Sequence, residues 1–365
     1  MIAVLLLLLG TLARADIVLG QSVPISAVAG DSGRGLSLGL GVAIAEVNAA
    51  GGINGDKVRL ALLDDQGKPE LLQSNTATLV GAEKALALVG YGGTPDGLAP
   101  LLEREKIALV GAGAAVSDGQ QGDSRYVFHL RPSYKAEIDK LASMIGSWLG
   151  SKRVGLLVQN DAFGIAMGNV ANAELAKRGM KPLAVVRHEA TAQDLGPAAD
   201  TLIKAAPDVV IMISNSKPAG LFIKRFREMG GGAQLYSLSN ANYEEVVELI
   251  GAETASGVGI VQVFPYPLDS RLKLARDYQA AMKSYAPKRA KLSYASMEGY
   301  IAGRTTLEAI RRAGKNPTRQ GVLQALEEMR AYDLGGFVVD FADSRHVGAK
   351  LVDVTMISGT GNLSR

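Results

Sequence analysis

The chain has 365 residues, more than one hydrophobic core usually supports, so two lobes are expected. Its 39 Lys and Arg nearly balance 36 Asp and Glu. No basic run or stripe of basic and aromatic residues occurs, so a nucleic-acid partner is not expected. The sequence has no cysteine, which excludes disulfides, thiol catalysis, iron–sulfur ligation and the acylated cysteine of a lipoprotein.

The first fifteen residues have the composition of an export signal. Residues 2–9 are all apolar, and Ala13-Arg14-Ala15 is a small-x-small cleavage site. We therefore expect residues 1–15 to be a signal peptide, cut after Ala15, and the mature protein to be periplasmic without a lipid anchor. Only Met1 precedes the apolar run, whereas export signals usually begin with Lys or Arg, so a buried N-terminal strand or helix remains the alternative.

A first series of strands and helices follows Asp16. Gly51-Gly52 end the first predicted helix, whose apolar positions recur at helical spacing, and Pro69 opens the next helix. The predicted strands of this series are 17–24, 58–63, 86–89 and 107–110.

The alternation restarts after Arg131-Pro132-Ser133. Apolar runs predict strands over 154–158, 183–186, 209–213, 235–238 and 258–263, with intervening helices such as 221–229. Helices are then expected over 270–285, 294–313 and 318–329, and β segments over 336–341 and 352–357. This order predicts an α/β fold with two Rossmann-like, doubly wound parallel sheets.

No catalytic motif is complete. The histidines, His129, His188 and His346, are scattered without metal-ligand spacing. Gly111-Ala112-Gly113 begins a dinucleotide fingerprint that lacks its third small residue. Asp64-Asp65 could act in acid–base chemistry or bind magnesium, but more simply these residues end a strand and support the next loop. An enzyme is not expected, and no cofactor or metal is implied.

Ligands of such sheets bind at the carboxyl ends of the strands. The candidate site is therefore formed by the Gly- and Ser-rich strand exits, although ordinary βα turns use the same residues.

Several segments together resemble the type I periplasmic solute-binding proteins of the leucine/isoleucine/valine-binding family. The most specific segment is Asn48-Ala49-Ala50-Gly51-Gly52-Ile53-Asn54-Gly55, because a helix end, a glycine stop and a hairpin turn occur in it together. Further matches are 20–26, 62–65, 160–164 and 293–300, so the resemblance covers essentially the whole mature chain.

The resemblance implies two lobes joined by three crossover strands, with a ligand bound between the lobes. The crossovers would fall near 131–133, 263–267 and 337–341. The first lobe would then comprise 16–131 plus 267–337, and the second lobe 132–266 plus 338–365. A monomer is expected.

Carried over residue by residue, the resemblance also implies the ligand contacts. Two loops of the first lobe would supply them, and the strand exits of the second lobe would supply most of the others. Tyr134 and Gln262, beside the crossovers, would complete the cleft wall, although each could simply pack at the lobe boundary. The expected ligand-binding residues are Gly92, Gly93, Thr94, Gly113, Ala114, Ala115, Tyr134, Phe163, Ser214, Asn215, Asn240, Asn242 and Gln262.

The resemblance further implies a binding protein that delivers its ligand to the membrane permease of an ABC importer. The ligand would be a small carboxylate: a branched-chain or other amino acid, a 2-oxo acid or an aromatic acid. Residues 239–242, where the family's amino-acid binders place an acid, are uncharged until Glu244, which favours an oxo or aromatic acid. The alternatives are a periplasmic receptor of the same fold that signals, and, more remotely, an exported hydrolase using Asp64-Asp65.

Overall fold

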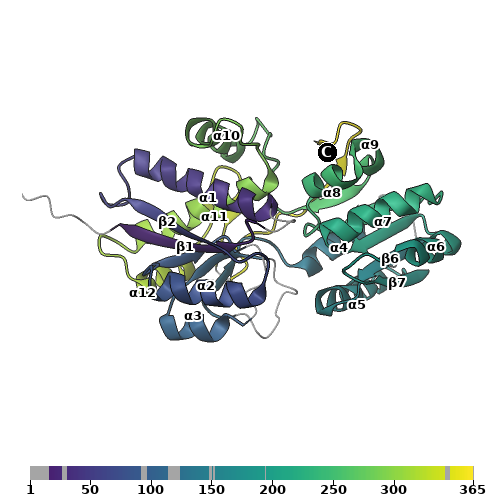
Figure 1. The fold of residues 1–365 in the computed structure, drawn as a ribbon, viewed down its shortest axis with the longest axis horizontal. Coiled ribbons are helices and arrows are strands. Elements are labelled where there is room, and N and C mark those ends of the chain that lie inside the picture. Colours follow the sequence, from purple (N-terminus) through teal and green to yellow (C-terminus); the bar gives the residue numbers. More distant parts are fainter. Residues whose placement is uncertain are drawn as a thin grey trace, which may run out of the picture.

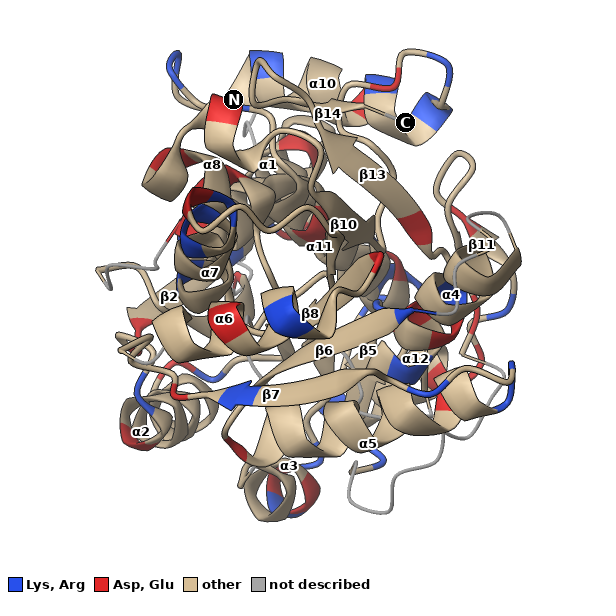
Figure 2. Cartoon of the chain, turned by 90° about the vertical axis from the view of Figure 1, so that its right-hand side faces the viewer, with Lys and Arg blue, Asp and Glu red and all other residues tan. Residues whose placement is uncertain are grey.

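The structure is a computed structural model that describes residues 16–26, 31–91, 97–113, 124–147, 150, 153–193, 195–341 and 346–364. Two α/β lobes lie side by side along the long axis of the molecule (Figure 1). Lys and Arg are interspersed with Asp and Glu around the second lobe (Figure 2). Within the described ranges, no helix has the length and apolarity needed to cross a membrane, and no group of His, Asp and Glu could hold a metal ion.

The first lobe is built on a parallel sheet of five strands in the order β2-β1-β3-β4-β5. Its strands are β1 (Ile17–Val23), β2 (Val58–Asp64), β3 (Ala87–Val89), β4 (Leu109–Ala112) and β5 (Val127–His129). Its helices are α1 (Asp31–Ala49), α2 (Pro69–Gly81), α3 (Ala99–Glu105), α10 (Lys273–Tyr285), α11 (Tyr294–Arg312) and α12 (Arg319–Glu327).

Alternating side chains of this sheet enter two different cores. Val18 and Leu88 pack with residues of α2 and α3, whereas Leu19 and Val89 pack with the core that includes α1 and α11. Burial on both faces explains why these strands are continuous apolar runs.

The second lobe has a sheet of seven strands in the order β14-β13-β10-β9-β8-β6-β7. All neighbouring strands from β10 through β9, β8 and β6 to β7 pair in parallel. Strand β13 pairs antiparallel with β10, and β14 pairs antiparallel with β13. The strands are β6 (Val154–Gln159), β7 (Ala184–His188), β8 (Val209–Ile213), β9 (Gln234–Ser237), β10 (Gly259–Gln262), β13 (Asp353–Ile357) and β14 (Leu363–Ser364). The helices are α4 (Tyr134–Ser147), α5 (Ala162–Ala176), α6 (Leu195–Ala205), α7 (Ser216–Glu228), α8 (Tyr243–Ile250) and α9 (Ala252–Ala255). The predicted α/β class with two parallel sheets is confirmed.

The chain passes between the lobes three times. The first passage lies between β5 and α4, and the second lies between β10 and α10, near the expected positions. The third passage lies later than the expected 337–341. A hairpin of β11 (Tyr332–Asp333) and β12 (Val338–Val339) comes first, and Val347 still forms a parallel bridge with His129 of β5. The chain joins the second sheet only at β13, because residues 346–348 remain hydrogen-bonded to the first lobe.

Several helices begin at the side of the lobes that faces the partner lobe, and their first turns are capped. Asp161 caps α5 by accepting a hydrogen bond from the Gly164 N–H (2.7 Å). Asn242 caps α8 in the same way, and Ser293 forms a capping box with Ser296 at the start of α11. These caps hold the strand-to-helix loops that form the site.

Candidate functional site

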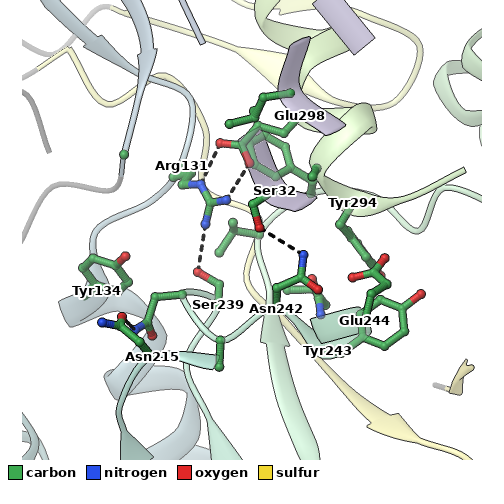
Figure 3. Close-up of a pocket in the computed structure, with 18 of the residues that line it drawn as sticks. Ser32, Arg131, Tyr134, Asn215, Ser239, Asn242, Tyr243, Glu244, Tyr294 and Glu298 are labelled. Atoms are coloured by element: carbon green, nitrogen blue, oxygen red, sulfur yellow. Dashed lines mark hydrogen bonds and ion pairs between the residues drawn. The ribbon is translucent and has the colours of Figure 1, made fainter. Parts of the chain in front are cut away.

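A cavity of about 440 Å³ lies between the two lobes (Figure 3). Its wall is drawn from α1 and α11 of the first lobe, from strand exits of the second lobe and from the first two passages between the lobes. The described residues that line it are Ser32, Leu36, Gly113, Arg131, Tyr134, Phe163, Asn215, Ser239, Asn240, Ala241, Asn242, Tyr243, Glu244, Gln262, Val263, Phe264, Tyr294, Ala295 and Glu298.

Arg131 is the cation at the centre of this wall. Its guanidinium forms a bidentate pair with Glu298 of α11, through Nε to Oε1 (2.7 Å) and Nη2 to Oε2 (2.5 Å). A third donor, Nη1, reaches the Ser239 hydroxyl of the second lobe (3.2 Å), and the group lies over the Phe264 ring. Burial alone would lower the pKa of Arg131, but the charge of Glu298 raises it. Arg131 is therefore charged, and Glu298 balances its charge.

Glu137 lies behind Ser239 and is fully buried. Its carboxyl group accepts hydrogen bonds from the Ser239 N–H (2.8 Å) and hydroxyl (2.7 Å). Burial raises the pKa of Glu137 to about 7, against the opposing effect of these hydrogen bonds and of Arg131. This carboxyl group holds the loop after β9 in place.

Glu244, in the first turn of α8, is an acidic residue of the wall whose carboxylate is not paired with a cation. Both of its carboxylate oxygens are buried and lack a hydrogen-bond partner of normal geometry. Burial raises the pKa of Glu244 to about 7, and the Tyr243 side chain and nearby backbone N–H groups counteract this only in part. An unpaired buried carboxylate is unfavourable, so this group requires either a proton or a cationic partner.

Aromatic side chains lie at both ends of the cavity. Tyr134 and Phe163 meet edge to face, with ring centroids 4.9 Å apart. Tyr243 and Tyr294 are arranged similarly at the Glu244 end, with centroids 6.3 Å apart. Faces and edges of aromatic rings can cover the apolar parts of a small ligand at either end.

Ser32 at the start of α1 connects the two lobes at the wall of the cavity. Its hydroxyl donates to Glu245 Oε1 (3.1 Å) and accepts from Asn242 Nδ2 (3.2 Å). Together with the bond from Arg131 to Ser239, these contacts hold the lobes closed around the cavity.

The structure brings seven of the thirteen expected ligand-binding residues to this cavity. They are Gly113, Tyr134, Phe163, Asn215, Asn240, Asn242 and Gln262. Ser214 is buried and does not line the cavity, because it lies beneath the wall, where its carbonyl accepts from Asn240 Nδ2 (3.2 Å). The expected contacts of the two first-lobe loops, Gly92, Gly93, Thr94, Ala114 and Ala115, lie outside the described residues.

Sequence reasoning did not select the charged residues of the wall. Arg131 was noted only as part of a crossover, although it is the one charged residue of 131–133. The uncharged stretch before Glu244 favours an oxo or aromatic acid in the sequence, yet the first turn of α8 places Glu244 at the wall. Glu298 carries no local signal, since its partner Arg131 is 167 positions away.

The paired carboxylates Asp64 and Asp65 support a loop, as the simpler interpretation predicted. Asp64 accepts from the Ile25 N–H (2.9 Å) and the Ser26 hydroxyl (2.5 Å), and these bonds lower its pKa to about 2. Asp65 accepts from the Ser22 hydroxyl (3.1 Å). Neither residue lines the cavity between the lobes.

Two α/β lobes that share a polar cavity, with hydrogen bonds between them at its wall, have the architecture of a protein that binds a small solute. Comparison with known proteins supports this class. A family model described as periplasmic binding protein matches residues 16–362.

The relatives are also named for binding. The chain is 31% identical to a substrate-binding periplasmic protein from Ralstonia solanacearum of known structure, covering 95% of this chain and 99% of that one with a TM-score of 0.87. It is 25% identical to the Leu/Ile/Val-binding protein BraC3 of Rhizobium johnstonii, over 87% of this chain and 85% of the relative. It is 24% identical to an amino acid binding protein of Pseudomonas aeruginosa, over 76% and 73% of the two chains.

The chain therefore belongs to the periplasmic binding protein family. It is a binding protein rather than an enzyme, with the type I fold that the sequence predicted.

Proposed function

We propose that this protein captures a small amino acid between its lobes and delivers it to the membrane permease of an ABC importer. The observation that carries the choice of ligand is Glu244 at the cavity wall, whose two carboxylate oxygens are buried and have no cationic partner. The ammonium group of an amino acid supplies the cation that this side chain lacks. With three side-chain torsions, Glu244 can turn its carboxylate toward a ligand in the cavity.

The charge of the wall supports an ammonium-bearing ligand over a simple acid. Among the described lining residues, Arg131 is the cation, and Glu298 and Glu244 are the acids. Since Arg131 is paired with Glu298, the remaining charge is negative. A 2-oxo or aromatic acid would add a second uncompensated negative charge, whereas a zwitterion brings its own positive charge to Glu244.

The carboxylate of the ligand is proposed to meet backbone N–H groups near Gly113, together with the first-lobe loop residues Gly92, Gly93, Thr94, Ala114 and Ala115. Neutral donors that converge at strand exits and helix starts are sufficient for an anion. Relatives named as amino acid and Leu/Ile/Val-binding proteins support this assignment.

Capture depends on closure of the lobes. A ligand that contacts both lobes binds the closed arrangement more tightly, so binding and closing form one equilibrium. The bonds of Ser32 to Asn242 and Glu245 belong to the closed arrangement.

The test of ligand class compares an amino acid with its 2-oxo analogue. A thermal-shift screen of the amino acids identifies the best ligand, which at 100 times its dissociation constant should add about 2.7 kcal/mol to the free energy of unfolding. Calorimetry should then show that the 2-oxo analogue, which lacks the ammonium group, binds at least tenfold more weakly. Glu244→Gln should abolish most of this difference, whereas the exposed control Glu103→Gln should preserve it. Tighter binding of the oxo acid, or turnover of the ligand, would contradict the proposal.

Delivery is tested separately in the producing bacterium. Deletion of the gene should abolish uptake of the labelled ligand, and a plasmid copy should restore it. Normal uptake combined with loss of a transcriptional or chemotactic response would instead identify the protein as a signalling receptor.

The mature protein is proposed to begin at Asp16, after a cut behind Ala15. The family model begins its match at residue 16, which supports this boundary. N-terminal sequencing of the protein recovered from the periplasm should read Asp-Ile-Val-Leu, and a mature start at Met1 would refute the cut.

A further inference from the structure

A second buried acceptor without a partner lies at the cavity wall. The Oδ1 atom of Asn240 is shielded from solvent and accepts no hydrogen bond. The other end of the same amide is satisfied, since Nδ2 donates to the Ser214 carbonyl (3.2 Å) and to Asn215 Oδ1 (3.1 Å). The side chain is therefore half satisfied, with its acceptor end unused.

The orientation of this amide follows from its neighbours. A backbone carbonyl can only accept a hydrogen bond, so the NH₂ end of Asn240 must face Ser214 and the oxygen must be the free end. Asn240 lies in the loop after β9, two residues before the N-cap of α8. Together with the two carboxylate oxygens of Glu244, it gives the wall three buried acceptor atoms that lack a hydrogen-bond partner of normal geometry.

The rest of the described wall is poor in aliphatic surface. Only Leu36 and Val263 carry branched aliphatic side chains. Besides the tyrosines, nine described lining residues have polar or charged side chains: Ser32, Arg131, Asn215, Ser239, Asn240, Asn242, Glu244, Gln262 and Glu298. A purely aliphatic ligand side chain would bury these groups without pairing the acceptor of Asn240, and an unpaired buried acceptor lowers affinity.

We propose that Asn240 determines specificity, and that the ligand carries a second hydrogen-bond donor besides its ammonium group. A carboxamide, a hydroxyl or a second ammonium group would serve, which makes the ligand a polar amino acid rather than leucine, isoleucine or valine. This inference rests on the proposed function, because the ammonium group at Glu244 sets the position of the ligand. It goes beyond the proposed function because it names the kind of ligand side chain that the cavity selects.

The test uses pairs of amino acids of nearly equal shape that differ in the donor: threonine against valine, asparagine against leucine, and glutamine against methionine. Calorimetry on the mature protein should show at least tenfold tighter binding of the donor-bearing member in one pair or more. A site built around a buried acceptor discriminates against the analogue that lacks the donor.

Asn240→Leu removes the acceptor while keeping the shape of the side chain, and should bring the affinity ratio of that pair close to one. Asn172→Leu on α5, outside the cavity, is the matched control and should leave the ratio unchanged. Asn240→Ser serves as a second variant if Asn240→Leu fails to fold, which the melting curve without ligand reveals. It should lower the ratio as well.

The outcomes separate this inference from the proposed function. Glu244→Gln should weaken both members of a pair by a similar factor, because both carry the ammonium group. If valine, leucine and methionine each bind as tightly as their partners, and Glu244→Gln still weakens both members of a pair, the role of Asn240 is wrong and the amino-acid function stands. If Glu244→Gln leaves both affinities unchanged, the proposed function fails and the present inference fails with it.

Discussion

Two buried acids, Glu137 and Glu244, have the same raised pKa in different surroundings. Glu137 accepts two hydrogen bonds from Ser239 and lies near Arg131, whereas neither oxygen of Glu244 has a partner of normal geometry. Desolvation is the largest influence on the pKa of both groups. The proton on Glu137 affects the stability of the fold, whereas the proton on Glu244 would compete with the ammonium group of the proposed ligand.

The pKa of Glu137 predicts how stability depends on pH. The ordinary pKa of 4.5 applies to the unfolded chain, and burial raises it to about 7 in the folded protein. Between these values the folded protein keeps a proton that the unfolded chain has lost. The free energy of unfolding therefore falls as pH rises, by up to about 1.4 kcal/mol per pH unit for this group. Denaturant unfolding at pH 5, 6 and 7 should show a smaller decline for Glu137→Gln, with Glu103→Gln as the control; an unchanged slope would contradict the role of Glu137.

The pKa of Glu244 predicts the pH dependence of ligand binding. Below about pH 7 the empty site holds a proton on this carboxyl group, which an ammonium ligand must displace. The negative charge of Glu245 contributes to the raised pKa of Glu244. The aromatic residues around Glu244 are Tyr243, Tyr266 and Tyr294. Affinity should rise up to about tenfold per pH unit below pH 7 and level off above it. Calorimetry should also detect proton release, and Glu244→Gln should remove both effects. An affinity that is flat between pH 5 and 8 would rule out this exchange.

Among individual residues, the uncharged side chains of the cavity wall could be predicted from the sequence more readily than the charged ones. The strand exits pointed to Asn215, Asn240 and Asn242 because polar residues that end buried strands gather at one edge of a sheet. The pairing of Arg131 with Glu298 depends on the packing of α11 beside the first passage, which local patterns do not encode. That the buried carboxylate of Glu244 has no cationic partner follows only from the three-dimensional structure around it.

Among the elements, α1 and α11 pack together by glycine contacts. A Cβ atom at Gly39 would lie 1.9 Å from the Ser296 carbonyl oxygen, and one at Gly299 would lie 2.1 Å from the Leu36 carbonyl oxygen. The two helix backbones are thus in direct contact, which fixes the part of α11 that presents Tyr294 and Glu298 to the cavity.

This contact predicts opposite effects for two glycines of the same helix. Gly39→Ala should lower the free energy of unfolding by about 1–3 kcal/mol, because backbone atoms cannot move aside easily. A Cβ at Gly41 meets nothing within 4 Å, so Gly41→Ala should raise the free energy of unfolding by up to about 1 kcal/mol through helix propensity. Thermal and urea unfolding of the two variants measure the difference. Equal effects would show that the helices are not packed this closely.

Most strands could be predicted from their apolar patterns, and the missed strands are short. Strand β5 has three residues and β14 has two, too few to show periodicity, and both depend on a neighbouring strand for their hydrogen bonds. The helix predicted over 294–313 matches α11 closely, because a serine cap and a regular apolar face mark it. The resemblance places the third passage at 337–341, which is too early because residues 346–348 are still hydrogen-bonded to the first lobe.

For the whole molecule, the relevant equilibrium is between open and closed lobes. Ser32→Ala removes both of its bonds between the lobes and should shift this equilibrium toward the open form. Without ligand, small-angle scattering should show a larger radius of gyration for Ser32→Ala than for the unchanged protein. Calorimetry should show that the variant binds the ligand with several-fold lower affinity. Ser74→Ala on α2, whose hydroxyl bonds only within its own helix, is the control. An unchanged radius and affinity would show that Ser32 does not hold the lobes closed.

The interleaving of the lobes along the chain also affects the order in which the protein can fold. The first lobe needs α11 from residue 294 onward to cover its sheet, and the second sheet gains its last strands only from residues 353–364. Neither lobe can be completed while the last quarter of the chain is still being synthesised. A chain whose two lobes both depend on its last residues is therefore expected to complete its folding only after synthesis has finished.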